Sequence, residues 1–160
     1  MPRPLIPPPV WALGAGAAMW GLNRALPLAS LLPRPWNRVG LGIGAIGFII
    51  DLVALMGFRR ADTTINPLHP SKATALVTAG LYRYTRNPMY VGLLLLLCGW
   101  AAWLGTLSPW VMPLLFAIVI TVAQIRPEER ALYALFGADY ERYCRQVPRW
   151  IGVRRGSSGP

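Results

Sequence analysis

The chain has 160 residues, of which 54% are hydrophobic and only 14% are charged, and its formal net charge is +10. This composition is too apolar for an ordinary soluble domain. The charge does not indicate nucleic-acid binding, because the basic residues fall in short segments between long apolar runs, as in membrane proteins. We therefore expect one all-α integral membrane domain over residues 1–155, with a flexible tail or cloning remnant at 156–160.

Four spanning helices are expected, at about residues 10–32, 39–58, 88–104 and 109–126. Asn23, Arg24 and Pro27 interrupt the first of them. The second contains a single charged residue, Asp51, and a charge at membrane depth is costly and usually has a partner. Arg24 is a candidate partner, and a structural pair and a substrate-site role for Asp51 both remain open.

The third and fourth spans come from one apolar run, residues 90–125, which contains no charge. As a single helix this run would be roughly 54 Å long, whereas the hydrocarbon core of a bilayer is about 30 Å thick. The sequence Gly105-Thr-Leu-Ser-Pro109 is rich in helix-breaking residues and predicts a tight hairpin at this point.

Glycines recur in the second span, in the run Gly40-Leu-Gly-Ile-Gly-Ala-Ile-Gly47. The run contains a G-x-G-x-x-G match, but no strand precedes it and it lies inside a span, which argues against a dinucleotide-binding loop. Gly40 and Gly44 instead form a GxxxG pair, which lets two membrane helices approach closely.

Two polar segments, residues 59–87 and 127–155, contain most of the arginines. They are expected on the cytoplasmic side of a bacterial inner membrane, together with both chain termini. The hairpin tip carries no charge, as an outside loop should. Arg34 and Arg38 lie outside in this topology and are a mild violation of the charge rule.

The second polar segment is expected to form short cytoplasmic helices. Pro127 suits the first turn of a helix, and Glu128 and Glu129 would then lie beside the helix N-terminus. Gly137 predicts a break before a second short helix. Because adjacent helical positions face different directions, at most one of the two glutamates is expected to touch a ligand.

All six tyrosines lie between Tyr82 and Tyr143, which indicates an interfacial belt, a pocket, or both. The single histidine, His69, is a candidate base, although a polar loop residue is the favoured interpretation. With one histidine and no CxxC or HExxH motif, no protein-bound metal is expected. Cys98 and Cys144 are expected to remain unpaired, because they lie at different depths.

Several of these segments, in order, resemble the isoprenylcysteine carboxyl methyltransferase family, whose pattern the phospholipid N-methyltransferases share. They are Gly80–Gly92, the apolar hairpin, Glu128-Glu129 and Leu135–Pro148. The resemblance covers roughly residues 60–150. It implies S-adenosylmethionine as methyl donor, held without a Rossmann domain in a pocket that faces the cytoplasm. It also implies a lipophilic small molecule, a lipid or a prenylated protein as acceptor.

The resemblance also implies site residues. A donor site is expected at His69, Tyr82, Tyr84, Arg86, Asn87, Pro88, Tyr90, Gly92, Glu128, Glu129, Tyr140 and Tyr143, with catalytic roles for Arg86, Glu129 and Arg145. A glutamate would pair with the donor ammonium, an arginine with its carboxylate, and tyrosine faces with adenine and sulfonium. Gln146 stands where eukaryotic members have an arginine, although Arg145 and Arg149 flank it.

Three other functions remain open at this point. They are a phospholipid N-methyltransferase, a membrane reductase that uses NADPH, and a non-catalytic protein that packs against lipids or other membrane proteins. The sequence does not separate O-, S- and N-methylation.

Overall fold

The computed structural model describes residues 6–60 and 76–152. Its helices are α1 (Pro8–Ala25), η1 (Trp36–Arg38), α2 (Val39–Arg60), η3 (Gly80–Arg83), α3 (Pro88–Leu104), η4 (Ser108–Trp110), α4 (Val111–Ile120), η5 (Thr121–Ile125) and α5 (Arg126–Gln146). These ranges contain no strand, only an isolated bridge between Ser30 and Thr106, so the all-α prediction is confirmed. His69 lies outside the described residues.

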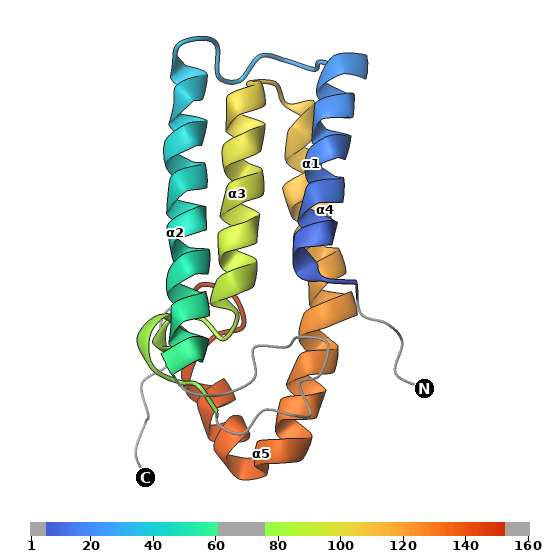
Figure 1. The fold of residues 1–160 in the computed structure, drawn as a ribbon. Helices are drawn as coiled ribbons and strands as arrows, with labels where there is room; N and C mark the ends of the chain where they lie inside the picture. The colour runs from blue at the N-terminus through green and yellow to red at the C-terminus, as the bar shows by residue number, and fades with distance from the viewer. Residues whose placement is uncertain (1–5, 61–75, 153–160) are drawn as a thin grey trace.

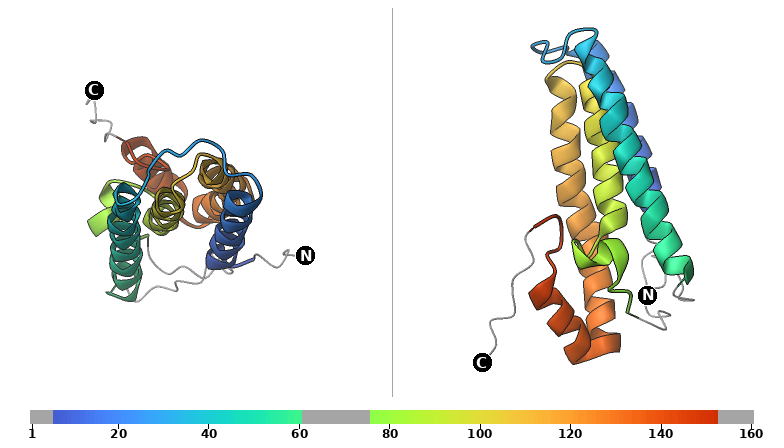
Figure 2. Two further views of the ribbon diagram at one scale, coloured as in Figure 1. Left: turned by 90° about the horizontal axis from the view of Figure 1, so that it is seen from above. Right: turned by 90° about the vertical axis from the view of Figure 1, so that its left-hand side faces the viewer.

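The helix α3 is the centre of the bundle and contacts α1, α2 and α4, which run alongside it (Figures 1 and 2). The core where α1, α3 and α4 meet includes the buried side chains of Met19, Leu97, Phe116 and Ile120. Lipid is as apolar as these side chains, so close packing rather than escape from water holds such helices together.

Glycines allow α2 to lie directly against α3. A Cβ atom added to Gly47 would lie 2.6 Å from the carbonyl oxygen of Gly92. A Cβ atom added to Gly99 would lie 2.6 Å from both the carbonyl oxygen of Gly40 and the amide nitrogen of Gly44. Backbone atoms cannot move aside as a flexible side chain can, so the packing role predicted for the Gly40–Gly44 pair is confirmed.

The predicted hairpin is also confirmed. The helix α3 ends at Leu104, and Gly105 follows in the left-handed conformation with φ of 82°, which favours glycine at the end of a helix. The chain then turns through η4 and returns as α4, antiparallel to α3 (Figure 1).

The returning helix is longer than predicted. α4, η5 and α5 form one continuous helix, so the prediction of a new helix start at Pro127 is wrong. Pro127 has no N–H to donate to the fourth residue before it, and the five residues of η5 adopt the wider π-helical turn just before this point. The helix thereby continues through the proline. At Gly137, with φ of 49° and ψ of −119°, α5 bends back, and the predicted break is confirmed.

The first helix is shorter than predicted, because it ends at Ala25 rather than near residue 32. Leu26 leaves the helical conformation with φ of −142°, as expected for a residue before proline, here Pro27. Residues 26–35 then connect α1 to η1 and α2.

The candidate pair of Arg24 with Asp51 is not formed. The guanidinium of Arg24 lies 5.4 Å from the centre of the Trp20 ring, at the end of the bundle where α1 ends. Asp51 instead lies in α2 against Gly92 of α3. The two residues are therefore at different levels of the bundle.

Two helices are long and apolar enough to cross a membrane, Trp36–Gly57 and Ser108–Gln146. The helix α3 is apolar but shorter. In the second of the long helices the uncharged part ends at Ile125, and α5 carries the charged residues that follow. These helices are consistent with a membrane protein.

Candidate active site

The segment before α3 is shaped by its own sequence. Gly80 has φ of 62° at the start of η3, where glycine is favoured. Asn87 precedes α3 in a non-helical conformation, and Pro88 occupies the first helical turn, where its missing N–H costs no hydrogen bond. The hydroxyl of Thr85 accepts a hydrogen bond of 3.1 Å from the amide of Asn87. This sequence sets the exact start of α3.

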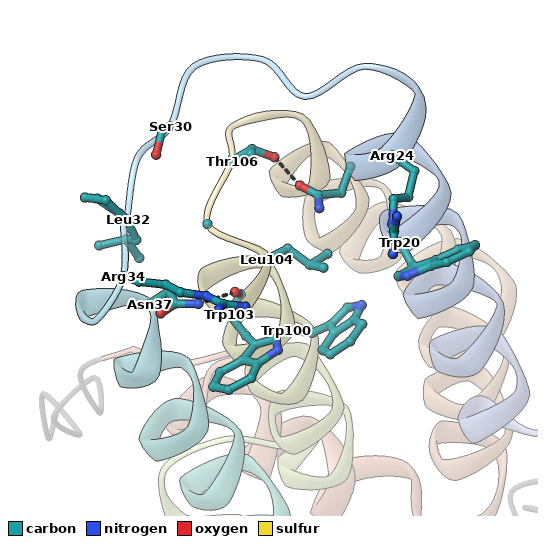
Figure 3. Close-up of a pocket in the computed structure, with 13 residues that line it drawn as sticks. Trp20, Arg24, Ser30, Leu32, Arg34, Asn37, Trp100, Trp103, Leu104 and Thr106 are labelled. Atoms are coloured by element: carbon teal, nitrogen blue, oxygen red, sulfur yellow. Dashed lines mark hydrogen bonds between the residues drawn. The ribbon is translucent and has the colours of Figure 1, made fainter.

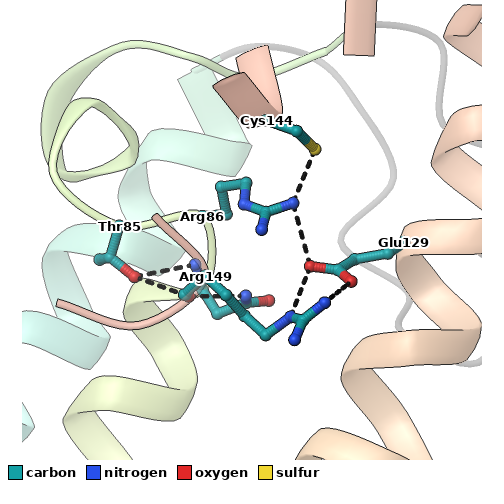
Figure 4. Close-up of polar contacts among 6 residues, drawn as sticks. Thr85, Arg86, Glu129, Cys144 and Arg149 are labelled. Atoms are coloured by element: carbon teal, nitrogen blue, oxygen red, sulfur yellow. Dashed lines mark hydrogen bonds and ion pairs between the residues drawn. The ribbon is translucent and has the colours of Figure 1, made fainter. Parts of the chain in front are cut away.

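The end of α5 and the residues after it lie against this segment. The amide of Arg86 donates to the carbonyl oxygen of Pro148 at 3.0 Å. The Thr85 hydroxyl and the Asn87 side-chain amide both donate to the carbonyl oxygen of Arg149, at 3.2 and 2.9 Å. Three hydrogen bonds thus join segments more than sixty residues apart, and Figure 4 shows the two that Arg149 accepts.

Aromatic side chains hold the second half of α5 in place. Tyr140, Tyr143 and Val147 are buried in one cluster, and the two rings lie 6.2 Å apart between their centres. The hydroxyl of Tyr143 donates to the carbonyl oxygen of Tyr82 at 2.7 Å. Burial raises the pKa of the Tyr140 and Tyr143 hydroxyls, so both remain neutral near physiological pH.

Glu129 lies between two arginines from different segments. Arg149 makes a two-pronged contact with it, with Nε to Oε1 at 2.9 Å and an Nη to Oε2 at 2.7 Å. Arg86 reaches Oε1 at 3.1 Å and also donates to the sulfur of Cys144 (Figure 4). Two guanidinium charges face one carboxylate, so these three side chains together carry one net positive charge.

Glu128 has a different environment from its neighbour. Its Oε1 accepts a hydrogen bond of 2.6 Å from the hydroxyl of Tyr90, at the start of α3. Burial raises the pKa of this carboxyl group to about 7, although the hydrogen bond from Tyr90 acts in the opposite direction. Glu128 is therefore poised to exchange a proton near neutral pH.

Residues 36–139 match the family described as phospholipid methyltransferase. The chain belongs to the phospholipid methyltransferase family. The resemblance that the sequence motifs indicated is thereby confirmed, and the matched residues include Arg86, Glu128 and Glu129.

Two enzymes are among the similar proteins. A protein-S-isoprenylcysteine O-methyltransferase of Schizosaccharomyces pombe is 38% identical over 122 residues, covering 72% of this chain and 49% of that enzyme. A methanethiol S-methyltransferase of Pseudomonas deceptionensis is 29% identical over 141 residues, covering 88% of this chain and 52% of that enzyme. This chain therefore spans about half the length of either.

An uncharacterized protein of Haemophilus influenzae is 43% identical over 63 residues, which are 39% of this chain and all of that protein. No solved structure matches the chain.

Three of the residues expected at the site, Tyr84, Gly92 and Arg145, are not brought into this cluster. Tyr84 is 69% exposed, and Gly92 packs against Asp51 between α2 and α3. The side chain of Arg145 is exposed and pairs with Glu141, one turn away on the same helix, at 2.7 Å. His69 lies outside the described residues.

The structure also adds Thr85, Cys144 and Arg149 to the residues that the sequence indicated. Only Arg149 had a signal in the sequence, because it is one of the two arginines that flank Gln146, the position where the resemblance implies an arginine. Its backbone carbonyl and its guanidinium both contact the other segment of the cluster. Arg149 therefore replaces Arg145 as the C-terminal arginine that reaches Glu129.

Proposed function

We propose that this chain is a membrane methyltransferase that uses S-adenosylmethionine to methylate an oxygen or sulfur atom of a lipophilic acceptor at the cytoplasmic membrane face. The observation that carries the proposal is the convergence of Arg86, Glu128, Glu129 and Arg149 beside an apolar hairpin in a chain of this family. Its relatives include protein-S-isoprenylcysteine O-methyltransferases and methanethiol S-methyltransferases.

The chemistry of these side chains fits the donor. Its ammonium requires a carboxylate, and Glu128 makes only one hydrogen bond, through Oε1, to the described residues. Its carboxylate requires a guanidinium, and Nε of Arg86 is buried without a hydrogen-bond partner among those residues. Glu129 is occupied by Arg86 and Arg149. We assign the ammonium to Glu128, and to Glu129 the role of positioning the two arginines.

The reaction requires little from the protein beyond alignment. S-adenosylmethionine supplies an electrophilic methyl group on a sulfonium, and the acceptor atom must lie in line with it. A carboxylate or thiolate acceptor needs no general base for this step. Tyr140 and Tyr143 position the C-terminal segment, and Arg86 and Glu128 orient the donor.

The proposed topology has four spans, formed by α1, α2, α3 and the uncharged part of the helix Ser108–Gln146. Its support is that these helices run side by side (Figure 1), with the polar cluster beyond one end of the apolar hairpin. A lipophilic acceptor then reaches the cluster sideways from the bilayer, and the arginine-rich end lies in the cytoplasm of a bacterial inner membrane.

The direct test is calorimetric binding of S-adenosylmethionine to the purified full chain. Glu128→Gln keeps an oxygen that can accept the hydrogen bond from the Tyr90 hydroxyl but removes the negative charge, so we expect at least about a tenfold loss of affinity. Glu141→Gln, which removes an exposed carboxylate paired with Arg145, is the matched control and should bind as the wild type does.

Failure of the wild-type chain to bind S-adenosylmethionine would overturn the proposal. Equal binding by the wild type and Glu128→Gln would remove Glu128 from the site. Glu129→Ala is a poor probe, because it leaves two partly buried guanidinium charges without their carboxylate and destabilises the fold as well.

A further inference from the structure

A cavity of about 390 Å³ opens at the end of the bundle opposite to Glu129. This volume is in the range of sites for small ligands. Its walls come from the end of α1, the loop that follows, η1, the end of α3 and the turn after it (Figure 3). Trp20, Arg24, Arg34, Asn37, Trp100 and Thr106 are among the residues that line it.

Arg24 and Arg34 line this cavity, and neither has a carboxylate partner within residues 6–60 and 76–152. The ion pairs of the described residues all lie at the other end of the bundle. Residues 1–50 and 88–127, which include every residue that lines the cavity, contain no aspartate or glutamate. The contact of Arg24 with the Trp20 ring favours a cation but does not neutralise it. Two positive charges at the cavity are therefore uncompensated.

Hydrogen bonds hold the cavity walls together. The amides of Leu31 and Leu32 both donate to the carbonyl oxygen of Gly105, at 2.9 and 3.1 Å. The Asn37 side-chain amide donates to the carbonyl oxygen of Trp103 at 2.8 Å. These bonds fasten the loop after α1 onto the end of α3. The backbone around these arginines is therefore held in place before a ligand binds.

The walls of the cavity contain both polar and aromatic side chains. The hydroxyl of Thr106 donates to Oδ1 of Asn23 at 2.6 Å, and the side-chain amide nitrogen of Asn23 makes no hydrogen bond to the described residues. The indole of Trp100 donates to the carbonyl oxygen of Gly16 at 3.1 Å, and the residue is 36% exposed. Tryptophans of this kind favour the depth of the lipid headgroups.

From these observations we infer that the cavity binds the phosphate group of a membrane lipid, in the leaflet opposite to the methyl-transfer site. Arginine forks match phosphate oxygens in geometry and charge. The indoles of Trp20 and Trp100 and the side chain of Leu104 provide contacts for the glycerol and the upper acyl chains. The site accounts for arginines on a side of the membrane where the charge rule disfavours them.

The test uses the full chain in a neutral detergent, titrated with dihexanoyl phosphatidylglycerol while the thermal unfolding temperature is followed. A ligand that binds only the folded state raises this temperature. Dihexanoylglycerol, which lacks the phosphate, and inorganic phosphate are the comparison ligands. We expect the Arg24→Gln/Arg34→Gln double variant to need at least about tenfold more phosphatidylglycerol for the same rise.

Arg38→Gln is the matched control, because Arg38 is exposed at the same end of the bundle but does not line the cavity. Stabilisation by phosphatidylglycerol that depends on Arg24 and Arg34 supports a lipid headgroup site. Equal stabilisation by inorganic phosphate, with the same dependence, supports the phosphate site with a soluble source. Stabilisation that the double variant retains, that Arg38→Gln loses equally, or that dihexanoylglycerol reproduces overturns the inference. The readout does not involve methyl transfer.

Discussion

At the scale of single residues, Glu128 and Glu129 show how position on a helix separates two neighbouring side chains of the same type. Glu129 faces the C-terminal segment and is held by Arg86 and Arg149. Glu128 faces the start of α3 and contacts Tyr90. One carboxylate is thereby fully used in joining the segments, and the other keeps an oxygen for a ligand.

The pKa of Glu128, raised by burial to about 7, predicts a pH-dependent affinity for S-adenosylmethionine. The donor ammonium pairs with the charged carboxylate, so binding below this pKa must first remove a proton. We expect the affinity to rise by about tenfold per pH unit between about pH 5.5 and about pH 7, and then to level off. Calorimetry in buffers of different ionisation enthalpy should detect one released proton at the acidic end.

The Glu128→Gln variant has no proton to lose at this position, and its weaker binding should not vary with pH over the same range. Asp139→Asn, which removes an exposed carboxylate paired with Arg142, should retain the wild-type slope. In the ligand-free protein the contribution of Glu128 to stability changes with pH in the opposite direction to the affinity. The contribution of Glu128 to stability is complete below its ordinary pKa of 4.5 and is lost as pH rises through about 7.

The sequence predicted which residues lie at this site better than it predicted which of them contact one another. The motif before α3 and the two glutamates were identified, and the structure joins both to the C-terminal segment. The choice between Arg145 and Arg149 was not predictable from spacing. It depends on where α5 ends at Gln146, which places Arg145 on an exposed helical turn and Arg149 in the non-helical segment beside Asn87.

At the scale of helices, the contact between α2 and α3 is set by which glycines face the partner helix. Gly47 and Gly99 have backbone atoms of the other helix within 2.6 Å of where a Cβ atom would lie. Gly42 lies in the same run but has nothing within 4 Å of that position. Only part of the glycine-rich run therefore serves packing.

This difference predicts opposite effects of two alanine substitutions. Gly47→Ala should separate α2 from α3 and lower the free energy of unfolding by about 1–3 kcal/mol, since the methyl group would meet a backbone carbonyl oxygen. Gly42→Ala adds a methyl group in open space and should raise stability by up to about 1 kcal/mol through better helix propensity. Thermal unfolding of both variants in the same detergent measures the difference. Equal losses would show that the contact does not depend on glycine at position 47.

The hairpin and the bend at Gly137 were predictable, because a left-handed glycine ends or bends a helix through local geometry alone. The continuation of the helix past Pro127 was not. A proline usually marks a helix start or a kink, and here the π-helical turn Thr121–Ile125 lets the helix continue. The end of α1 at Ala25 follows from Pro27, yet the apolar residues beyond it suggested a longer span.

At the scale of the whole molecule, the two ends of the bundle differ in charge and in the kind of anion they suit. One end combines arginines with Glu128, Glu129, Asp139 and Glu141. The other has Arg24, Arg34 and Arg38 with no acidic residue in the neighbouring sequence. The first end suits a zwitterionic donor and the second a phosphate. In the proposed topology the two ends face opposite sides of the membrane.

Cysteine labelling of spheroplasts tests this arrangement, in a chain whose own Cys98 and Cys144 are replaced by alanine. Ala29 and Ala138 are both exposed, in the loop after α1 and just after the bend of α5. Because the α5 end carries more arginines, we expect Ala29→Cys to react with an impermeant maleimide at once and Ala138→Cys only after the membrane is permeabilised. Reaction of Ala138→Cys in sealed spheroplasts would place the methyl-transfer cluster outside, where cytoplasmic S-adenosylmethionine does not reach it.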